Sequence, residues 1–106
     1  MPTEDAPPWR IDIAFLLNNN DLGFAQSARR HRIGRARVES VLLSHPYVEI
    51  EQGGRRRLLW VGADWSGRRL EVVAVIETQR LIVIHAMDAR PKLIRLYAER
   101  FNRGTH

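Results

Sequence analysis

The sequence contains no cysteine among its 106 residues. A disulfide framework, a thiolate nucleophile and a cysteine-ligated zinc site are therefore excluded. No HExxH motif occurs, and no two of the four histidines are spaced four residues apart, so we expect no metal site and no cofactor. Glycine-rich phosphate loops and the GxSxG motif are also missing. These absences remove several large classes of enzyme.

Long apolar runs are missing as well, since no run approaches the roughly 20 residues that cross a bilayer as a helix. The length, with 44% hydrophobic and 27% charged residues, is typical of one globular domain. We expect a soluble, cytoplasmic protein with no membrane partner. Residues 1–8 hold three prolines and two acidic residues, which predicts a flexible tail before a single domain at residues 9–106.

Lysine is almost absent, because Lys92 is the only lysine beside 16 arginines. The net charge of +5 is concentrated in residues 22–37, 55–70 and 90–106, which carry +5, +4 and +4. A forked guanidinium suits phosphate and carboxylate ligands, although a GC-rich genome would produce the same bias. The distribution favours an acidic partner, either a nucleic acid or an acidic protein.

Hydrophobic periodicity predicts helices first and strands afterwards. Residues 9–17 fit either a strand or a helix, and we expect a helix from Asp21 to about His31 and another around residues 38–42. Period-two segments predict strands at residues 47–51, 55–61, 68–77 and 81–86, with a hairpin turn at Gln52-Gly53-Gly54.

A C-terminal helix is expected to begin near Asp88 and Pro91 and to bury Leu93, Ile94, Tyr97 and Phe101. The order of elements predicts an α+β fold. We expect a four-stranded, mainly antiparallel sheet with two N-terminal helices and one C-terminal helix packed on it.

Two arginine-rich stretches are candidate binding sites. The first, residues 29–37, lies between two short helices and could belong to a helix-turn-helix, but Arg30 would stand where such a turn needs a small residue. A solvated basic face is the alternative. In the second, Arg55 and Arg57 share one face of a strand and could clamp a phosphate, or could simply protect a strand edge from aggregation.

His85 is the most informative single residue, because it ends an otherwise aliphatic strand and precedes Arg90 and Lys92. A histidine there can exchange protons near neutral pH, while the two cations supply fixed charge to a phosphate. The alternative is a structural histidine whose ring is satisfied by hydrogen bonds.

Three short motifs resemble the BrnT-like toxins of bacterial type II toxin–antitoxin systems, whose fold is similar to that of RelE ribonucleases. Arg30-His31-Arg32-Ile33 resembles the family's Lys-His-Gly-Val, and Trp65-Ser66-Gly67-Arg68 resembles its small-Gly-Arg hairpin. Ile84 to Ala89, followed by Arg95-Leu96-Tyr97, aligns with the family's Ile-Ser-Ala-Arg-Lys-Ala and Arg-x-Tyr. The resemblance spans residues 24–101. The family's Ser-Ala-Arg is His85-Ala86-Met87 here, so the usual arginine is missing at Met87, and the family's glycine is Arg32.

The resemblance implies a growth-inhibiting toxin that cleaves cellular RNA and forms a hetero-oligomer with a cognate antitoxin. Metal-independent attack of a ribose 2′-hydroxyl on phosphate needs a base, an acid and fixed positive charge. We expect His85, Arg90 and His31 to be catalytic, and Arg30, Arg55, Arg57 and Lys92 to bind RNA. The alternative hypothesis is a noncatalytic basic module that docks an acidic protein or a nucleic acid.

Overall fold

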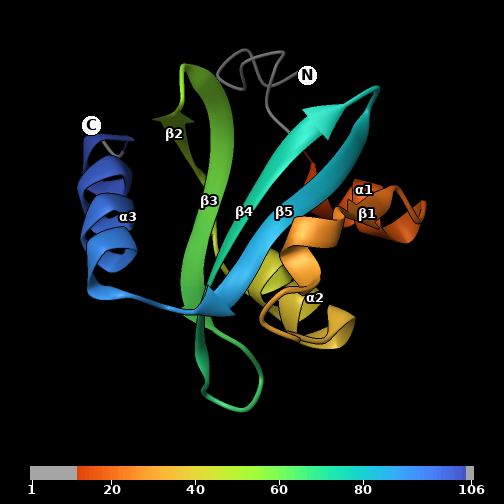
Figure 1. Cartoon of the computed structure of the whole chain (residues 1–106), viewed down its shortest axis with the longest axis horizontal. Coiled ribbons are helices and arrows are strands. Elements are labelled where there is room, and N and C mark those ends of the chain that lie inside the picture. Colours follow the sequence, from red (N-terminus) through yellow and green to blue (C-terminus); the bar gives the residue numbers. More distant parts are fainter. Residues whose placement is uncertain (1–11, 105–106) are drawn as a thin grey trace, which may run out of the picture.

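Five strands form one mixed sheet in the order β1-β5-β4-β3-β2 (Figure 1). The structure is a computed structural model, and it describes residues 12–104; the expected tail at residues 1–8 lies outside this range. The elements are α1 (Ile13–Asn18), β1 (Leu22–Phe24), the 3-10 helix η1 (Gln26–Arg29), α2 (Arg35–Ser44), β2 (Val48–Gln52), β3 (Arg55–Ala63), β4 (Arg69–Glu77), β5 (Arg80–Asp88) and α3 (Pro91–Gly104). The α+β class is confirmed.

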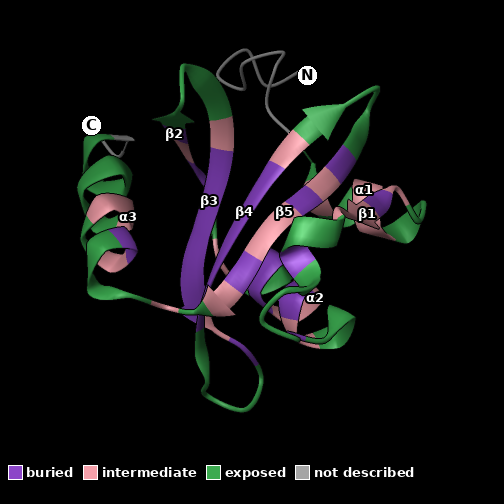
Figure 2. Ribbon diagram, in the orientation of Figure 1, coloured by how far each residue is buried: buried purple, intermediate pink, exposed green. Residues whose placement is uncertain are grey.

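The sheet has helices on both faces, so its central strands are buried on both sides (Figures 1 and 2). Alternate residues of β3 show this: Leu58 and Trp60 join the core on the α2 side, while Leu59 and Val61 join a second core with Leu93 of α3. This alternation is the period-two geometry of a strand. It explains why the middle strands of the sequence are apolar at successive positions.

Tight turns connect the antiparallel strands. Gly53 and Gly54 have φ angles of 57° and 76°, which confirms the expected glycine hairpin between β2 and β3. Thr78 and Gln79 make the corresponding turn between β4 and β5 with φ angles of 51° and 63°. These two hairpins therefore lie at the same end of the sheet, and the β3–β4 turn lies at the other end.

The expected helix from Asp21 to His31 is wrong. Leu22 to Phe24 instead form β1, which pairs in parallel with β5, and only η1 follows as a single short turn. Gly23 is a poor helix residue, and a Cβ at this position would lie 2.9 Å from the side chain of Ile82. Pairing with β5 brings the two strands close together at Gly23, so these residues form a strand and not the expected helix. The expected four-stranded sheet is corrected accordingly to five strands.

The remaining helices agree more closely with the sequence. The ambiguous segment at residues 9–17 contributes α1, whose first turn is capped by a hydrogen bond from the Phe15 N–H to the Asp12 carboxylate. The expected helix near residues 38–42 is α2. Helix α3 begins at Pro91 as expected, but Phe101 is 40% exposed and is not a core residue. The last turns of α3 extend beyond the edge of the second core, which ends at Tyr97.

Candidate active site

Glu71 is the third residue of β4 and is fully buried, and the candidate site is built around it. His85 Nε2 lies 2.6 Å from Glu71 Oε2, and the Arg90 guanidinium donates to the same oxygen through Nη2 at 2.7 Å. The backbone N–H of Arg90 donates to Glu71 Oε1 at 2.9 Å. We call Glu71, His85 and Arg90 the Glu71 cluster.

The charge of the Glu71 cluster follows from these contacts. Burial on its own would raise the pKa of Glu71, but the hydrogen bonds from Arg90 and His85 outweigh it and hold the pKa below the ordinary value. The hydrogen bond to Glu71 likewise raises the pKa of Arg90. Glu71 is thus ionised near neutral pH and can only accept hydrogen bonds. His85 therefore donates its Nε2–H to Glu71, and in the neutral ring this leaves the Nδ1 lone pair as the proton acceptor.

A β-bulge brings His85 to Glu71. Val73 pairs with His85 but Ala74 pairs with Val83, so Ile84 is an extra residue in β5. Strict alternation would turn residue 85 to the α2 side, together with Val83. The bulge instead turns His85 to the face of Glu71 and Val73.

The same bulge positions His31. The Ile84 carbonyl accepts a hydrogen bond from Ser27 Oγ at 2.7 Å, which ties η1 to β5. The loop that follows η1 then carries His31 to His85, with ring centres 6.0 Å apart and the planes 81° from parallel. Arg32, in the next position, has a φ of 57°, so the chain turns sharply there. His31 is exposed, and His85 is half-buried.

The structure therefore brings together all three residues that the sequence suggests as catalytic. Two of the expected RNA-binding residues lie beside them in the chain: Arg30 precedes His31 at the end of η1, and Lys92 is the second residue of α3, two after Arg90. Both side chains are exposed. They form no ion pair with any residue that the structure describes, so both can contact a polyanion near the Glu71 cluster.

Arg55 and Arg57 lie elsewhere. Val61 is the residue of β3 that pairs with Glu71, and Arg57 and Arg55 come four and six residues before it. The strand rise places them roughly 13 and 20 Å from that point along β3. Arg57 is half-buried, and its Nε has no hydrogen-bond partner among the described residues, whereas Arg55 is exposed. These two arginines are remote from the Glu71 cluster.

Sequence reasoning missed Glu71. The available signal was a single carboxylate inside the run from Leu70 to Ile76, which is otherwise entirely apolar. An ionised side chain in a doubly covered strand needs partners, because desolvation without them is very costly. An isolated charge in such a run therefore marks a position where cationic side chains converge.

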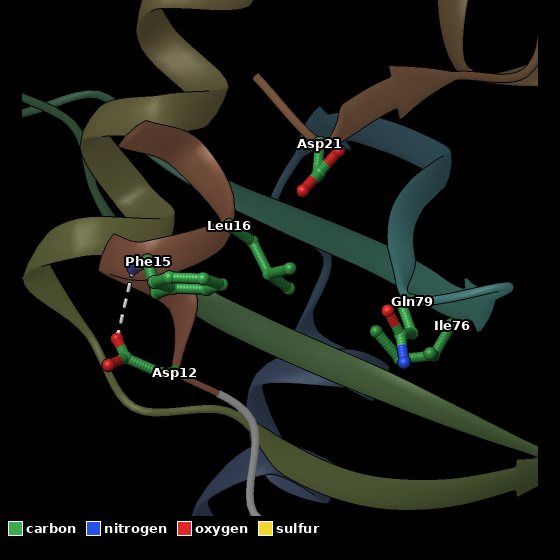
Figure 3. A pocket seen from close by; sticks show the side chains of 6 residues that line it. All are labelled: Asp12, Phe15, Leu16, Asp21, Ile76 and Gln79. Atoms are coloured by element: carbon green, nitrogen blue, oxygen red, sulfur yellow. Dashed lines mark hydrogen bonds between the residues drawn. The ribbon is translucent and has the colours of Figure 1, made fainter. Parts of the chain in front are cut away.

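A pocket of about 370 Å³ opens near α1 and the β4–β5 turn, at the opposite end of the sheet (Figure 3). Its walls come from Phe15, Leu16, Ile76 and Gln79, and two carboxylates, Asp12 and Asp21, lie at its margin. Among the residues that the structure describes, neither a histidine nor an arginine lines it. Two like-charged carboxylates do not suit a polyanion, so we do not place the site in this pocket.

Within residues 12–104 no cluster of three or more acidic, histidine or cysteine side chains is arranged to hold a metal ion. In the same part of the chain, no helix combines the length and apolar character needed to cross a membrane. The chain matches no protein-family model, and neither a curated protein nor a solved structure shows significant similarity to it.

Proposed function

We propose that this protein is the toxin of a type II toxin–antitoxin system and a metal-independent endoribonuclease. One observation carries the proposal: His31, His85 and Arg90, which are distant in the sequence, meet beside the buried carboxylate of Glu71. Two imidazoles and a guanidinium can supply the base, the acid and the fixed positive charge that cleavage through the 2′-hydroxyl requires.

Each group has a role that its contacts favour. His85 Nδ1 takes the proton of the 2′-hydroxyl, because Nε2–H is held by Glu71. The 2′-oxygen then bonds to phosphorus while the bond to the 5′-oxygen breaks, which leaves a 2′,3′-cyclic phosphate. Protonated His31 gives its proton to the departing 5′-oxygen. Arg90, whose side chain is 54% exposed, balances the charge of the phosphorane.

Two departures from the BrnT-like pattern, Met87 and Arg32, can be interpreted in the same geometry. Met87 pairs directly with Glu71, so an arginine at position 87 would lie beside this carboxylate. Here Arg90 supplies the guanidinium from the start of α3 instead. Arg32 occupies the position of the family's glycine and has the left-handed φ that glycine adopts most easily. Both positions are compatible with a RelE-like ribonuclease.

Cleavage of RNA by the purified chain in EDTA tests this proposal. We expect 5′-hydroxyl and cyclic phosphate ends, and a rate that falls by about 10² to 10⁴ in the His85→Ala variant. Arg80→Ala is the matched control, because it removes an exposed cation from the opposite end of β5. Cleavage that requires a divalent metal, or that is equally fast without His85, would contradict the mechanism.

The cytoplasmic toxin role and the antitoxin partner need a test in cells. We expect growth arrest when the chain is induced alone and relief when the neighbouring gene is expressed with it. We also expect the folded His85→Ala and Arg90→Ala variants, at matched expression, to lose toxicity. Toxicity retained by both variants would place the site elsewhere, even if cleavage were confirmed.

A noncatalytic binding module is the second candidate, and the loop around His31 favours it. Arg29, Arg30 and Arg32 are exposed there and form no ion pair with the described residues. Such a cluster can bind an acidic protein or nucleic acid without chemistry. Binding that weakens steeply with salt, together with intact RNA after prolonged incubation, would support this function over the first.

A further inference from the structure

Trp65 lies in the turn between β3 and β4, and its side chain is unusually open to solvent. The residue is 63% exposed, although tryptophan is among the largest apolar side chains. The Arg37 guanidinium lies over the ring, 4.7 Å from the ring centroid. Arg37 covers one face of the indole, and the high exposure of the residue leaves ring surface to which a planar ligand can bind. We call Trp65 and Arg37 the Trp65 platform.

The Trp65 platform is held rigidly by Asp64, which is buried. Its Oδ1 accepts hydrogen bonds from the Ser66 N–H at 2.8 Å, the Ser66 hydroxyl at 2.7 Å and the Arg68 N–H at 3.1 Å. Its Oδ2 accepts from Arg37 Nη1 at 2.6 Å. Arg37 Nη1 also lies 3.0 Å from Ser66 Oγ. The turn and the guanidinium are thus fixed before any ligand binds, which lowers the entropic cost of stacking on the ring.

The Trp65 platform is at the same end of the sheet as the Glu71 cluster. In Figure 1 the β3–β4 turn extends beyond the end of β5, where the chain leaves for α3. Arg68, in the same turn, forms a two-pronged ion pair with Asp88 at 2.7 and 3.1 Å. Asp88 is three residues beyond His85 in β5. The hydrogen bond from Arg68 is the main cause that lowers the pKa of Asp88, and the charge of His31 adds to it. The Arg68–Asp88 ion pair thus connects the turn that carries Trp65 to the end of β5 that carries His85.

We propose that the Trp65 platform stacks an unpaired base of single-stranded RNA whose backbone is bound at the Glu71 cluster. The inference rests on the proposed function and adds the substrate class to it. A duplex keeps its bases stacked on one another, whereas an unpaired base can use a tryptophan face. Such stacking tolerates any base, because every base has a π-face. The platform thus contributes affinity for single strands without selecting a sequence.

A binding titration with a 2′-O-methyl oligoribonucleotide tests the stacking site independently of cleavage, because this RNA lacks the attacking hydroxyl. With the full-length protein at fixed salt, we expect Trp65→Ala to weaken binding by about five- to a hundredfold. Trp65→Phe keeps an aromatic face and should retain most of the affinity. Phe15→Ala is the matched control, since it removes an exposed aromatic ring of similar exposure, 59%, at the other end of the sheet.

A second titration uses an oligonucleotide of the same length without bases. Trp65→Ala should then cost no further affinity, because no base remains to stack. Equal binding by the parent and Trp65→Ala proteins to the complete oligonucleotide would overturn the stacking site and leave the ribonuclease proposal standing. Binding that depends on Trp65 without any cleavage of natural RNA would support the site and overturn the ribonuclease. Failure of the parent protein to bind at low salt would overturn both, and would favour a protein partner for this face.

Discussion

Glu71 shows how one buried carboxylate can organise several surface groups. Its two oxygens accept hydrogen bonds from His85, from the Arg90 side chain and from the Arg90 backbone at the start of α3. It therefore sets the tautomer of His85, the direction of Arg90 and the point where α3 begins. In the proposed mechanism Glu71 does not contact the substrate; it positions the residues that do.

Replacing Glu71 by Gln separates these effects. An amide keeps the size of the side chain but loses the charge that faces Arg90 and His85, so we expect unfolding to become easier by about 1 to 3 kcal/mol. RNA cleavage should fall by about ten- to a hundredfold, because His85 loses its orientation. Denaturant unfolding and initial rates measure the two losses.

The control is Glu77→Gln, which changes an exposed glutamate on the same strand and should move stability by less than about 0.5 kcal/mol. If Glu71→Gln and Glu77→Gln had equal effects, Glu71 would not position His85 and Arg90. A stable Glu71→Gln protein with full activity would have the same meaning.

Arg32 differs from Glu71, because its backbone conformation matters more than its side chain. Its φ of 57° is unfavourable for a residue with a Cβ by about 1 to 2 kcal/mol, whereas glycine has no such penalty. Glycine is also more flexible when unfolded, so Arg32→Gly should raise the unfolding free energy by a few tenths to about 1 kcal/mol. Chemical denaturation of the purified proteins measures the change.

Arg30→Gly is the matched comparison, because Arg30 is a neighbouring arginine with a right-handed φ of −56°. Arg30→Gly should lower the unfolding free energy by up to about 1 kcal/mol, because glycine makes the unfolded chain more flexible and relieves no left-handed φ at this position. Both variants lose one positive charge, so their difference reports the backbone alone. If both changes destabilise the protein equally, the left-handed geometry at Arg32 is not strained.

At the scale of elements, the sequence was most informative where local chemistry decides the structure. The glycine turn after β2, the proline at the start of α3 and the long apolar β4 were all predictable, because each depends on a few adjacent residues. Strand β1 was not predictable. It has only three residues, and it exists because β5 pairs with it in parallel.

The sequence predicted the histidines and the arginine of the candidate site but did not predict Glu71, which lies at its centre. The sequence indicates His85 because it comes directly after four aliphatic residues of a strand, Arg90 because it follows His85 closely, and His31 through a resemblance. Their convergence depends on the bulge at Ile84, which shifts the face of every later side chain in β5. Hydrophobic alternation read from one sequence cannot locate such an insertion. The placement of Arg55 and Arg57 also required the strand register.

Helix α3 offers a test of how far the second core extends. Leu93 is buried against β2 and β3, so Leu93→Ala should lower the unfolding free energy by about 2 to 5 kcal/mol. Phe101 is 40% exposed and only stacks on Tyr97, so Phe101→Ala should cost about 1 kcal/mol or less. Denaturant midpoints of the two variants rank the positions. A larger loss at Phe101 would mean that the last turns of α3 are packed more tightly than the structure shows.

Buried ionisable groups decide how the stability of the whole molecule changes with pH. Two carboxyl groups, Glu71 and Asp64, are buried and held ionised by cations and backbone N–H groups. In each case burial alone would raise the pKa, but the hydrogen bonds outweigh it and the pKa is lowered. On the alkaline side, burial raises the pKa of the Tyr97 hydroxyl, which donates a hydrogen bond to the Pro46 carbonyl.

These directions predict a stability plateau near neutral pH with a loss on each side. The unfolded chain takes up protons on Asp64 and Glu71 near their ordinary pKa values of 3.8 and 4.5, before the folded protein does, so stability falls as the pH drops below about 5. Tyr97 acts in the opposite direction, because the unfolded tyrosine ionises first as the pH rises above about 10. Urea midpoints measured across this range should fall at both ends, and Asp64→Asn should flatten the acid side while lowering the plateau. A midpoint that stays constant down to about pH 2 would show that neither carboxylate is better stabilised in the folded protein than in the unfolded chain.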